Sequence, residues 1–195
     1  EIINQAMEEG AAISIFGDYD CDGIGASAIL YDTFSAIGAD VTCMLPSREL
    51  EGYGLNESAV RQAAQQSDLL ITVDCGITNL AEVKLAKELG LRVIVTDHHR
   101  ALEELPAADA VINPHIAKNY PFTDLCGAGV AFKLAQAVLE DDGYELLDLV
   151  ALATVADIVP LVGENRAIVK AGLELINQAP RLGIEALIRH AGMQG

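Results

Sequence analysis

Short apolar segments alternate with longer segments of helical composition along the first two thirds of this chain. Strand-like composition occurs in five places: residues 11–16, 41–45, 69–73, 91–95 and 110–112. The segment 69–73 is apolar apart from Thr72, and 91–95 is apolar apart from Arg92, as expected of strands covered on both faces of a parallel sheet. Segments with helical composition lie between them, at 24–37, 57–66 and 79–89. This alternation predicts an α/β protein whose parallel sheet has about five strands and is flanked by helices.

The pattern changes after about residue 122, where apolar positions recur at helical spacing. Two such series are Val130, Leu134, Ala137 and Val138, and Leu146, Leu149, Val150 and Ala153. Residues 166–191 predict two more helices, separated near Pro180. We therefore expect a Rossmann-like sheet with a helical C-terminal portion closing over its carboxyl edge. Residues 1–165 would form the catalytic domain, and 166–195 a helical extension or the start of a connector to a further domain.

The composition is that of a well-packed globular protein. The chain has 195 residues, 51% of them hydrophobic, and a mean hydropathy of +0.30. It has no apolar run long enough to span a bilayer and no recognisable signal peptide, so we expect no membrane partner and a cytoplasmic location. The chain starts at Glu1 without a methionine, which suggests a piece of a longer protein.

The cysteines and the net charge restrict the chemistry further. The four cysteines, Cys21, Cys43, Cys75 and Cys126, form no C-x-x-C pair, so a zinc knuckle or disulfide framework is not expected, and each should be a small buried hydrophobe. Twelve basic and twenty-nine acidic residues give a net charge of −17. That balance argues against direct binding of nucleic acid, unless the acids hold metal or a basic surface lies elsewhere in a longer protein.

Acidic residues follow three of the predicted strands. Asp18, Asp20 and Asp22 follow the first strand, Asp74 follows 69–73, and the run Asp97, His98 and His99 follows 91–95. Ligands of open parallel sheets bind at the carboxyl ends of the strands, so these residues are expected to meet at one edge. Like charges brought together need compensation, and hard oxygen ligands suit Mg²⁺ or Mn²⁺. The alternative for the first motif alone is a solvated acidic loop.

Four further residues have two interpretations each. Asp157 stands alone in an apolar run, so it is either a metal ligand or a cap at a helix end before Pro160. Gly127 and Gly129 open a predicted helix, where backbone N–H groups can bind a phosphate, or where small residues serve packing. Arg48, in the loop after a strand, is a candidate contact for a substrate phosphate or a structural residue.

Together these segments resemble the four motifs of the DHH phosphoesterase superfamily. The motifs are Gly17-Asp-Tyr-Asp-Cys-Asp-Gly, Val73-Asp-Cys-Gly-Ile, Thr96-Asp-His-His and Thr154-Val-Ala-Asp. Further segments resemble its branch of single-stranded-DNA-specific 5′→3′ exonucleases: Pro46-Ser-Arg, Glu51-Gly-Tyr-Gly-Leu, Asn113-Pro, Tyr120-Pro-Phe and Cys126-Gly-Ala-Gly-Val-Ala-Phe-Lys-Leu. The resemblance covers about residues 13–165.

The resemblance implies a role for each motif residue. It makes Asp20, Asp22, Asp74, His98 and Asp157 ligands of two Mn²⁺ or Mg²⁺ ions, with Asp18 as a further ligand. Asp97 would contact the ligand residues without binding metal itself, and His99 would contact the scissile phosphate. Asp74 and the two histidines would thus be the catalytic residues. In one respect the chain departs from the pattern: Phe16 stands where many members have a histidine, which leaves one metal ligand open.

The implied function is metal-dependent phosphodiester hydrolysis in DNA repair and recombination. The partners would be single-stranded DNA, bound by the full-length protein, and replication or repair proteins. One alternative is a phosphodiesterase acting on short oligonucleotides or cyclic dinucleotides, and another is a catalytically silent replication scaffold. Because the basic surface is expected elsewhere, we expect the 195-residue chain alone to bind metal but to degrade DNA poorly.

Overall fold

The computed structural model describes residues 1–48 and 52–193 and contains the predicted parallel sheet. Its strands are β1 (Ile13–Gly17), β2 (Val41–Met44), β3 (Leu69–Val73), β4 (Arg92–Thr96) and β5 (Ala110–Ile112). They are ordered β2-β1-β3-β4-β5, and every pairing is parallel. The fold class predicted from the sequence is confirmed, and so are all five strands, within one or two residues at their ends.

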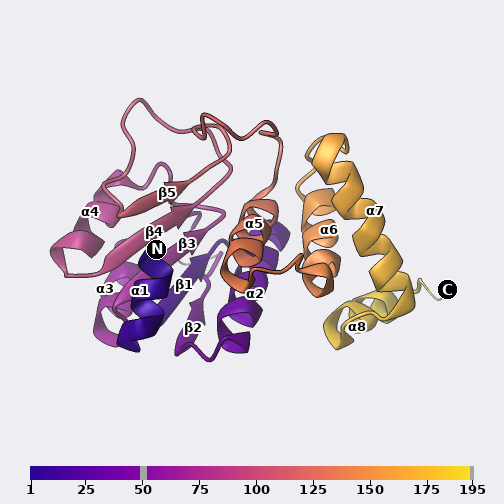
Figure 1. The fold of residues 1–195 in the computed structure, drawn as a ribbon, viewed down its shortest axis with the longest axis horizontal. Helices are drawn as coiled ribbons and strands as arrows, with labels where there is room; N and C mark the ends of the chain where they lie inside the picture. Colours follow the sequence, from indigo (N-terminus) through magenta and orange to yellow (C-terminus); the bar gives the residue numbers. More distant parts are fainter. Residues whose placement is uncertain (49–51, 194–195) are drawn as a thin grey trace.

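Helices cover both faces of the sheet (Figure 1). One face packs against α1 (Ile2–Glu9), α2 (Cys21–Ala36) and α5 (Gly127–Leu139), and the other against α3 (Glu57–Gln66) and α4 (Leu80–Glu88). Strand side chains alternate between the two resulting cores. Ile13 and Ile15 belong to the first core and Phe16 to the second. The central strands are therefore buried on both faces, as their apolar sequence requires.

The C-terminal helices form a further layer beside α2 and α5 (Figure 1). After the short 3₁₀ helix η1 (Tyr144–Leu146) come α6 (Leu147–Ala156), α7 (Gly163–Gln178) and α8 (Leu182–His190). Small residues allow close packing here: a Cβ at Gly25 of α2 would lie 3.2 Å from Ala153, and one at Gly172 of α7 would lie 2.3 Å from the Ala151 Cβ. The expectation that the helical portion closes over the carboxyl edge is met only in part, because α6 packs beside α2. Among the described helices of this portion, the N-terminus of α5 and the C-terminal end of α6 reach that edge.

Other details differ from the sequence-based expectations. The pattern did not predict α1, a short helix whose first residue has no side-chain cap and whose chain reverses at Gly10, in the left-handed region at φ 67°. Cys75 and Cys126 are buried as expected, but Cys21 and Cys43 are exposed. Cys21 opens α2, and Cys43 lies on the edge strand β2, so neither is enclosed by a second layer. In the described residues, no helix is long and apolar enough to cross a membrane. The division at residue 165 stays a prediction.

Strand β5 follows a long loop, residues 97–109, that contains no helix. This edge strand has three residues, and contacts of a neighbouring side chain add to its backbone hydrogen bonds with β4. At its start, Asp109 accepts a hydrogen bond from the Val93 N–H at 2.7 Å and pairs with Lys87. The ladder then pairs Ile112 with Thr96, which places the segment after β5 beside the end of β4.

Candidate metal centre

The acidic segments meet at the carboxyl edge of the sheet. Asp18, Asp20 and Asp22 follow β1, Asp74 follows β3, Asp97, His98 and His99 follow β4, and Asp157 comes from the end of α6. Strands β1, β3 and β4 are neighbours in the sheet. Residues distant in sequence therefore come together for the topological reason that the sequence suggested.

Helix N-termini hold two of these carboxylates. Asp20 caps α2, its Oδ1 accepting hydrogen bonds from the Asp22 and Gly23 N–H groups, both at 2.9 Å. Asp22 accepts from the Gly127 N–H at 2.6 Å and the Ala128 N–H at 2.7 Å, in the first turn of α5. The positive ends of the two helix dipoles offset part of the negative charge gathered here. Asp22 thereby also ties α2 to α5.

This arrangement gives Gly127 a partner other than the expected phosphate. Its N–H donates to Asp22 in this structure, and its expected role toward a phosphate stays a prediction. A Cβ at this position would lie 2.5 Å from Asp74 Oδ1, so only glycine lets α5 approach the β3 loop. Gly129 is buried, and a Cβ there would lie 3.2 Å from the Leu125 side chain. Gly127 thus brings α5 against the site, Gly129 lets α5 pack on Leu125, and a phosphate contact at Gly129 stays a prediction.

Gly127→Ala is therefore expected to weaken Mn²⁺ binding at least about 10-fold, because the added methyl group displaces Asp74. Titration calorimetry on the 195-residue chain measures the effect. Gly183→Ala is the matched control, since a Cβ at Gly183 of α8 meets no atom within 4 Å. Equal Mn²⁺ affinity in the two variants would contradict this view of Gly127.

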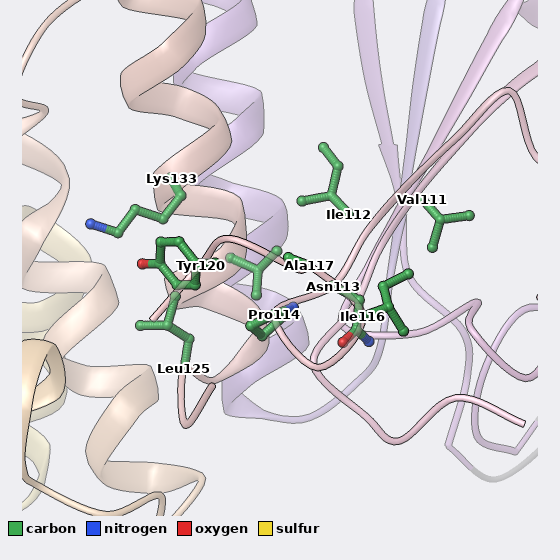
Figure 2. A pocket seen from close by; sticks show the side chains of 10 residues that line it. Val111, Ile112, Asn113, Pro114, Ile116, Ala117, Tyr120, Leu125 and Lys133 are labelled. Carbon is green, nitrogen blue, oxygen red and sulfur yellow. The ribbon is translucent and has the colours of Figure 1, made fainter. Parts of the chain in front are cut away.

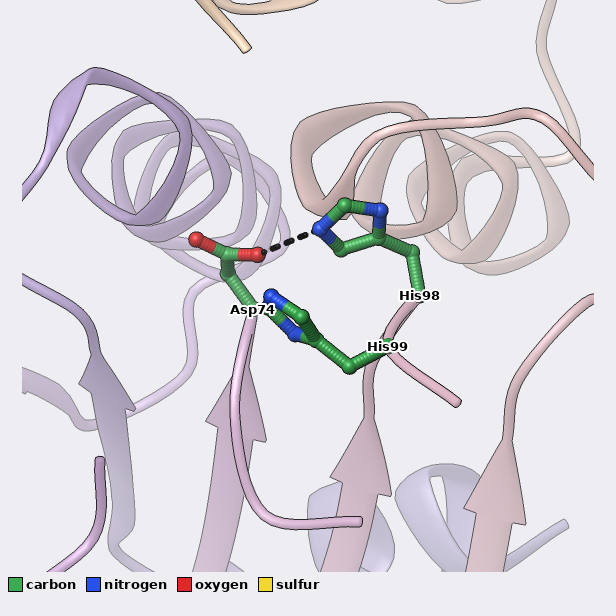
Figure 3. A group of neighbouring side chains, drawn as sticks. All are labelled: Asp74, His98 and His99. Carbon is green, nitrogen blue, oxygen red and sulfur yellow. Dashed lines mark ion pairs between the residues drawn. The ribbon is translucent and has the colours of Figure 1, made fainter. Parts of the chain in front are cut away.

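His98 lies between three carboxylates. Its Nε2 is 3.1 Å from Asp74 Oδ1, 3.6 Å from Asp22 Oδ2 and 3.8 Å from Asp157 Oδ2; Figure 3 shows the first of these pairs. Burial raises the pKa of Asp74 to about 8, and the charge of Asp22 adds to this effect. Burial disfavours the charged imidazole, but Asp74, Asp22 and Asp157 outweigh it and raise the pKa of His98 to about 9. Without a cation, the cluster relies on protons for compensation.

Two buried carboxylate oxygens lack a hydrogen-bond partner in the described part of the chain, Asp18 Oδ2 and Asp74 Oδ1. His98 Nε2 lies near the second of these but forms an ion pair without hydrogen-bond geometry. Burial raises the pKa of Asp18 as well. Such oxygens are costly to bury unless they meet a cation or a proton.

Candidate ligand atoms fall into three overlapping groups within the described residues. They are Asp18, Asp20 and Asp74; Asp22, His98 and Asp157; and Asp74, His98 and His99. Within each group the ligand atoms lie within 4.8 Å of one another. Asp74 and His98 each belong to two groups. Carboxylates with one or two imidazoles are a donor set that fits Mn²⁺ or Mg²⁺.

Asp97 holds the histidine segment from below. Its Oδ1 accepts hydrogen bonds from the His98 N–H at 2.7 Å, the His99 N–H at 3.0 Å and His99 Nδ1 at 2.8 Å, and its Oδ2 accepts from the Ile77 N–H at 3.0 Å. Although burial opposes it, these donors lower the pKa of Asp97. With both oxygens engaged, Asp97 orients His98 and His99. The His99 ring itself remains 44% exposed at the surface of the site.

Two residues around the site were not singled out from the sequence. The Tyr53 hydroxyl lies 3.1 Å from His99 Nε2 and 3.2 Å from Nδ1, and its ring meets the imidazole edge-on. Burial and the nearby charge of Asp74 raise the pKa of Tyr53. The second residue is Asn113, whose side chain donates to the His99 carbonyl. Both belong to segments that carried the family resemblance, but no local pattern assigned them a contact.

Phe16 and Arg48 are not among the candidate ligands that the described residues bring together. Phe16 is buried in the core beneath α3 and α4, so position 16 supplies packing instead of a ligand. Arg48 is exposed, with its guanidinium carbon 5.3 Å from the centroid of the Tyr19 ring. A role for Arg48 toward a phosphate stays a prediction. Glu51, part of the same predicted motif, lies outside the described residues.

A parallel α/β sheet with carboxylates and imidazoles gathered at its carboxyl edge defines a metal-binding class of protein. This chain belongs to the DHH family: residues 12–154 match the DHH family, N-terminal domain.

Comparisons with individual proteins give more detail. The single-stranded-DNA-specific exonuclease RecJ of Bacillus subtilis is 46% identical over 192 residues, which cover 97% of this chain and 24% of that protein. RecJ of Thermus thermophilus is 41% identical over 198 residues, covering all of this chain and 29% of that protein. The chain thus spans about a quarter of the length of these relatives.

Solved structures are similar as well. The fold matches an exonuclease RecJ bound to manganese with a TM-score of 0.91 and 40% identity, over 98% of this chain and 50% of that one. It also matches Thermus thermophilus RecJ in complex with Mn²⁺, with a TM-score of 0.87 and 38% identity, over 99% of this chain and 28% of that one.

Proposed function

We propose that this chain is the metal-binding catalytic domain of a RecJ-like exonuclease, which hydrolyses single-stranded DNA from its 5′ end during repair and recombination. The observation that carries the proposal is the convergence of Asp20, Asp22, Asp74, His98 and Asp157 at one sheet edge, with buried oxygens lacking partners. The relatives named above as single-stranded-DNA-specific exonucleases support the choice of substrate.

Each residue has a defined task in this proposal. Asp20, Asp22, Asp74, His98 and Asp157 hold two Mn²⁺ or Mg²⁺ ions, with Asp18 as a further ligand. Bound in this way, such ions activate water and stabilise the charge that develops on the phosphate. His99, with its exposed ring oriented by Asp97, donates a hydrogen bond to the scissile phosphate. The Tyr53 hydroxyl lies beside both ring nitrogens of His99, and the phosphate would replace it as the partner of Nε2.

The net charge of −17 sets a limit on what the chain does alone. DNA binding needs basic side chains to neutralise phosphates, and the acids of the metal centre account for only part of the excess. We therefore place the surface that holds DNA in a longer protein, in line with the greater length of the relatives. Replication or repair proteins would act through that longer protein as partners.

The decisive experiment combines metal binding with digestion. We expect the 195-residue chain to bind Mn²⁺ in titration calorimetry. We expect it to degrade 5′-labelled single-stranded DNA poorly, because it has few basic side chains to bind the strand. The longer protein should digest the same DNA with Mn²⁺ and stop when the metal is chelated. Full processive digestion by the 195-residue chain would refute the division of labour, and absence of Mn²⁺ binding would refute the metal centre.

The same substrates distinguish the alternative functions. A phosphodiesterase would prefer dinucleotides or cyclic dinucleotides to long single strands. A replication scaffold would bind DNA or protein partners with no Mn²⁺-dependent turnover. The presence of every motif acid favours an active enzyme, since a scaffold has no need to gather buried carboxylates.

A further inference from the structure

Asn113 lies where the edge strand β5 meets the histidine segment. It directly follows β5, is only 2% exposed, and its side chain makes two hydrogen bonds. Nδ2 donates to the His99 carbonyl at 2.8 Å, and Oδ1 accepts from the His115 N–H at 2.9 Å. A carbonyl can only accept and an N–H can only donate, so these partners fix the orientation of the amide.

The two partners also explain why the residue is asparagine. An ionised aspartate here would accept from His115 but would place negative charge against the His99 carbonyl. A serine hydroxyl is too short to reach both groups. The backbone carbonyl of Asn113 accepts from the Ile116 and Ala117 N–H groups, both at 3.2 Å, which closes the turn after β5 whatever the side chain.

The surroundings of the amide are mainly apolar. Figure 2 shows Asn113 in the wall of a cavity of about 340 Å³, among Val111, Ile112, Pro114 and Ile116. In such surroundings a hydrogen bond is electrostatically stronger than in water, and an unpaired carbonyl costs more. The bond to His99 is thus a firm contact between the edge strand and the site.

The hydrogen bond from Asn113 to the His99 carbonyl links the two ends of the long loop before β5. Fourteen positions separate His99 from Asn113, and the intervening loop contains no helix that would fix its course. The Asp97 N–H donates to the Ile112 carbonyl at 3.0 Å, which secures the start of the histidine segment. Asn113 secures its end. Asp97 holds the same segment from within, through the backbone N–H groups of His98 and His99.

We propose that Asn113 is a positioning residue, which holds the His99 carbonyl and thereby sets the directions of both imidazoles at the metal centre. The proposal rests on the proposed function only for its effect on DNA hydrolysis, because the geometry of the histidines can be measured without metal or substrate. Removing a partner that orients metal ligands typically lowers metal affinity or activity 10–100-fold.

Asn113→Asp tests the proposal. The variant is expected to change the imidazole ¹⁵N signals of His98 and His99 in the metal-free chain and to leave those of His190 unchanged. It should also weaken Mn²⁺ binding about 10-fold or more in titration calorimetry. In the longer protein it should lower kcat for single-stranded DNA with a smaller effect on KM, because the change lies at the reacting groups.

The matched control is Gln136→Glu, which makes the same amide-to-acid change on α5. Its Nε2 donates to the Asp142 carbonyl at 2.8 Å, outside the metal centre. It should leave the histidine signals and the Mn²⁺ affinity unchanged. Asn113→Ser is the milder variant should the aspartate prevent folding, as checked by circular dichroism, and it should shift the same signals by less.

The outcomes separate the two proposals. A folded Asn113 variant with wild-type histidine signals and wild-type Mn²⁺ affinity would overturn the positioning role. Altered signals and weaker Mn²⁺ binding, in a longer protein that never hydrolyses DNA, would support the positioning role and overturn the proposed function.

Discussion

Asp74→Asn is expected to abolish Mn²⁺-dependent hydrolysis, by about 10³-fold or more, while the chain stays folded. Asp74 belongs to two of the three groups of candidate ligands, and its Oδ1 has no hydrogen bond in the described residues. Removing its charge also relieves crowding among buried carboxylates. The metal-free variant should therefore be at least as stable as the wild type in thermal unfolding.

Metal binding gives a second measurement of the same change. Mn²⁺ should raise the melting temperature of the wild-type chain, because a ligand that binds only the folded state stabilises it, and this increase should be small in Asp74→Asn. Asp141→Asn is the control, since that carboxylate is exposed and, within residues 1–48 and 52–193, accepts one hydrogen bond, from the Gly143 N–H. Undiminished DNA hydrolysis by Asp74→Asn in the longer protein would exclude the proposed metal centre.

Arg181→Met is expected to produce the largest loss of stability, about 2–4 kcal/mol. The Arg181 Nε lies 2.8–2.9 Å from both carboxylate oxygens of Asp148, its Nη1 lies 2.6 Å from Asp32, and its Nη2 donates to the Glu145 carbonyl at 2.7 Å. Asp148 is 1% exposed and pairs with Arg181, so without the arginine it becomes a buried charge that has lost its cation. The arginine is itself 32% exposed, which keeps the loss below that of a fully buried pair.

Thermal unfolding measures this loss, which corresponds to a fall of about 5–15 °C in Tm for a chain of this size. Arg61→Met is the matched control, because Arg61 pairs with Glu57 on the exposed face of α3 and should cost about 0.5 kcal/mol or less. Adding Asp148→Asn to Arg181→Met should restore part of the stability by removing the unpaired charge. Equal Tm values for the two arginine variants would show that this cluster is not a structural clamp.

The sheet could be predicted because the burial of each strand is visible in its own sequence, as a short run of mainly apolar residues. Leu69–Val73 is apolar apart from Thr72, and the structure buries all five residues. The helix α1 was missed because it is short and lacks a side-chain cap, so its formation depends on packing Ile3 and Ala6 against the sheet. The exposure of Cys43 was likewise undecided by composition, because it follows from β2 lying at the edge of the sheet.

The acidic residues of the candidate site could be predicted from the sequence, but the residues that hydrogen-bond to the site residues could not. Asp74 and Asp97 each follow a buried strand, and the rule for parallel sheets places both at one edge. The hydrogen bond from Gly127 to Asp22 had no such signal, since a glycine that opens a helix suits a phosphate or a carboxylate equally. Tyr53 and Asn113 reach His99 from other segments, and no spacing in the sequence encodes such contacts.

The sequence by itself determined the parallel α/β fold, the positions of the acids after the strands and the family to which the chain belongs. Only the tertiary structure decided which oxygens have no hydrogen-bond partner, why α5 must begin with Gly127, and how Asn113 holds His99. The physical reason is the sequence distance over which each feature is determined. The burial of a strand and the residue at its end are encoded within a few neighbouring residues, whereas the alignment of donors with carboxylates depends on how separate elements pack against one another.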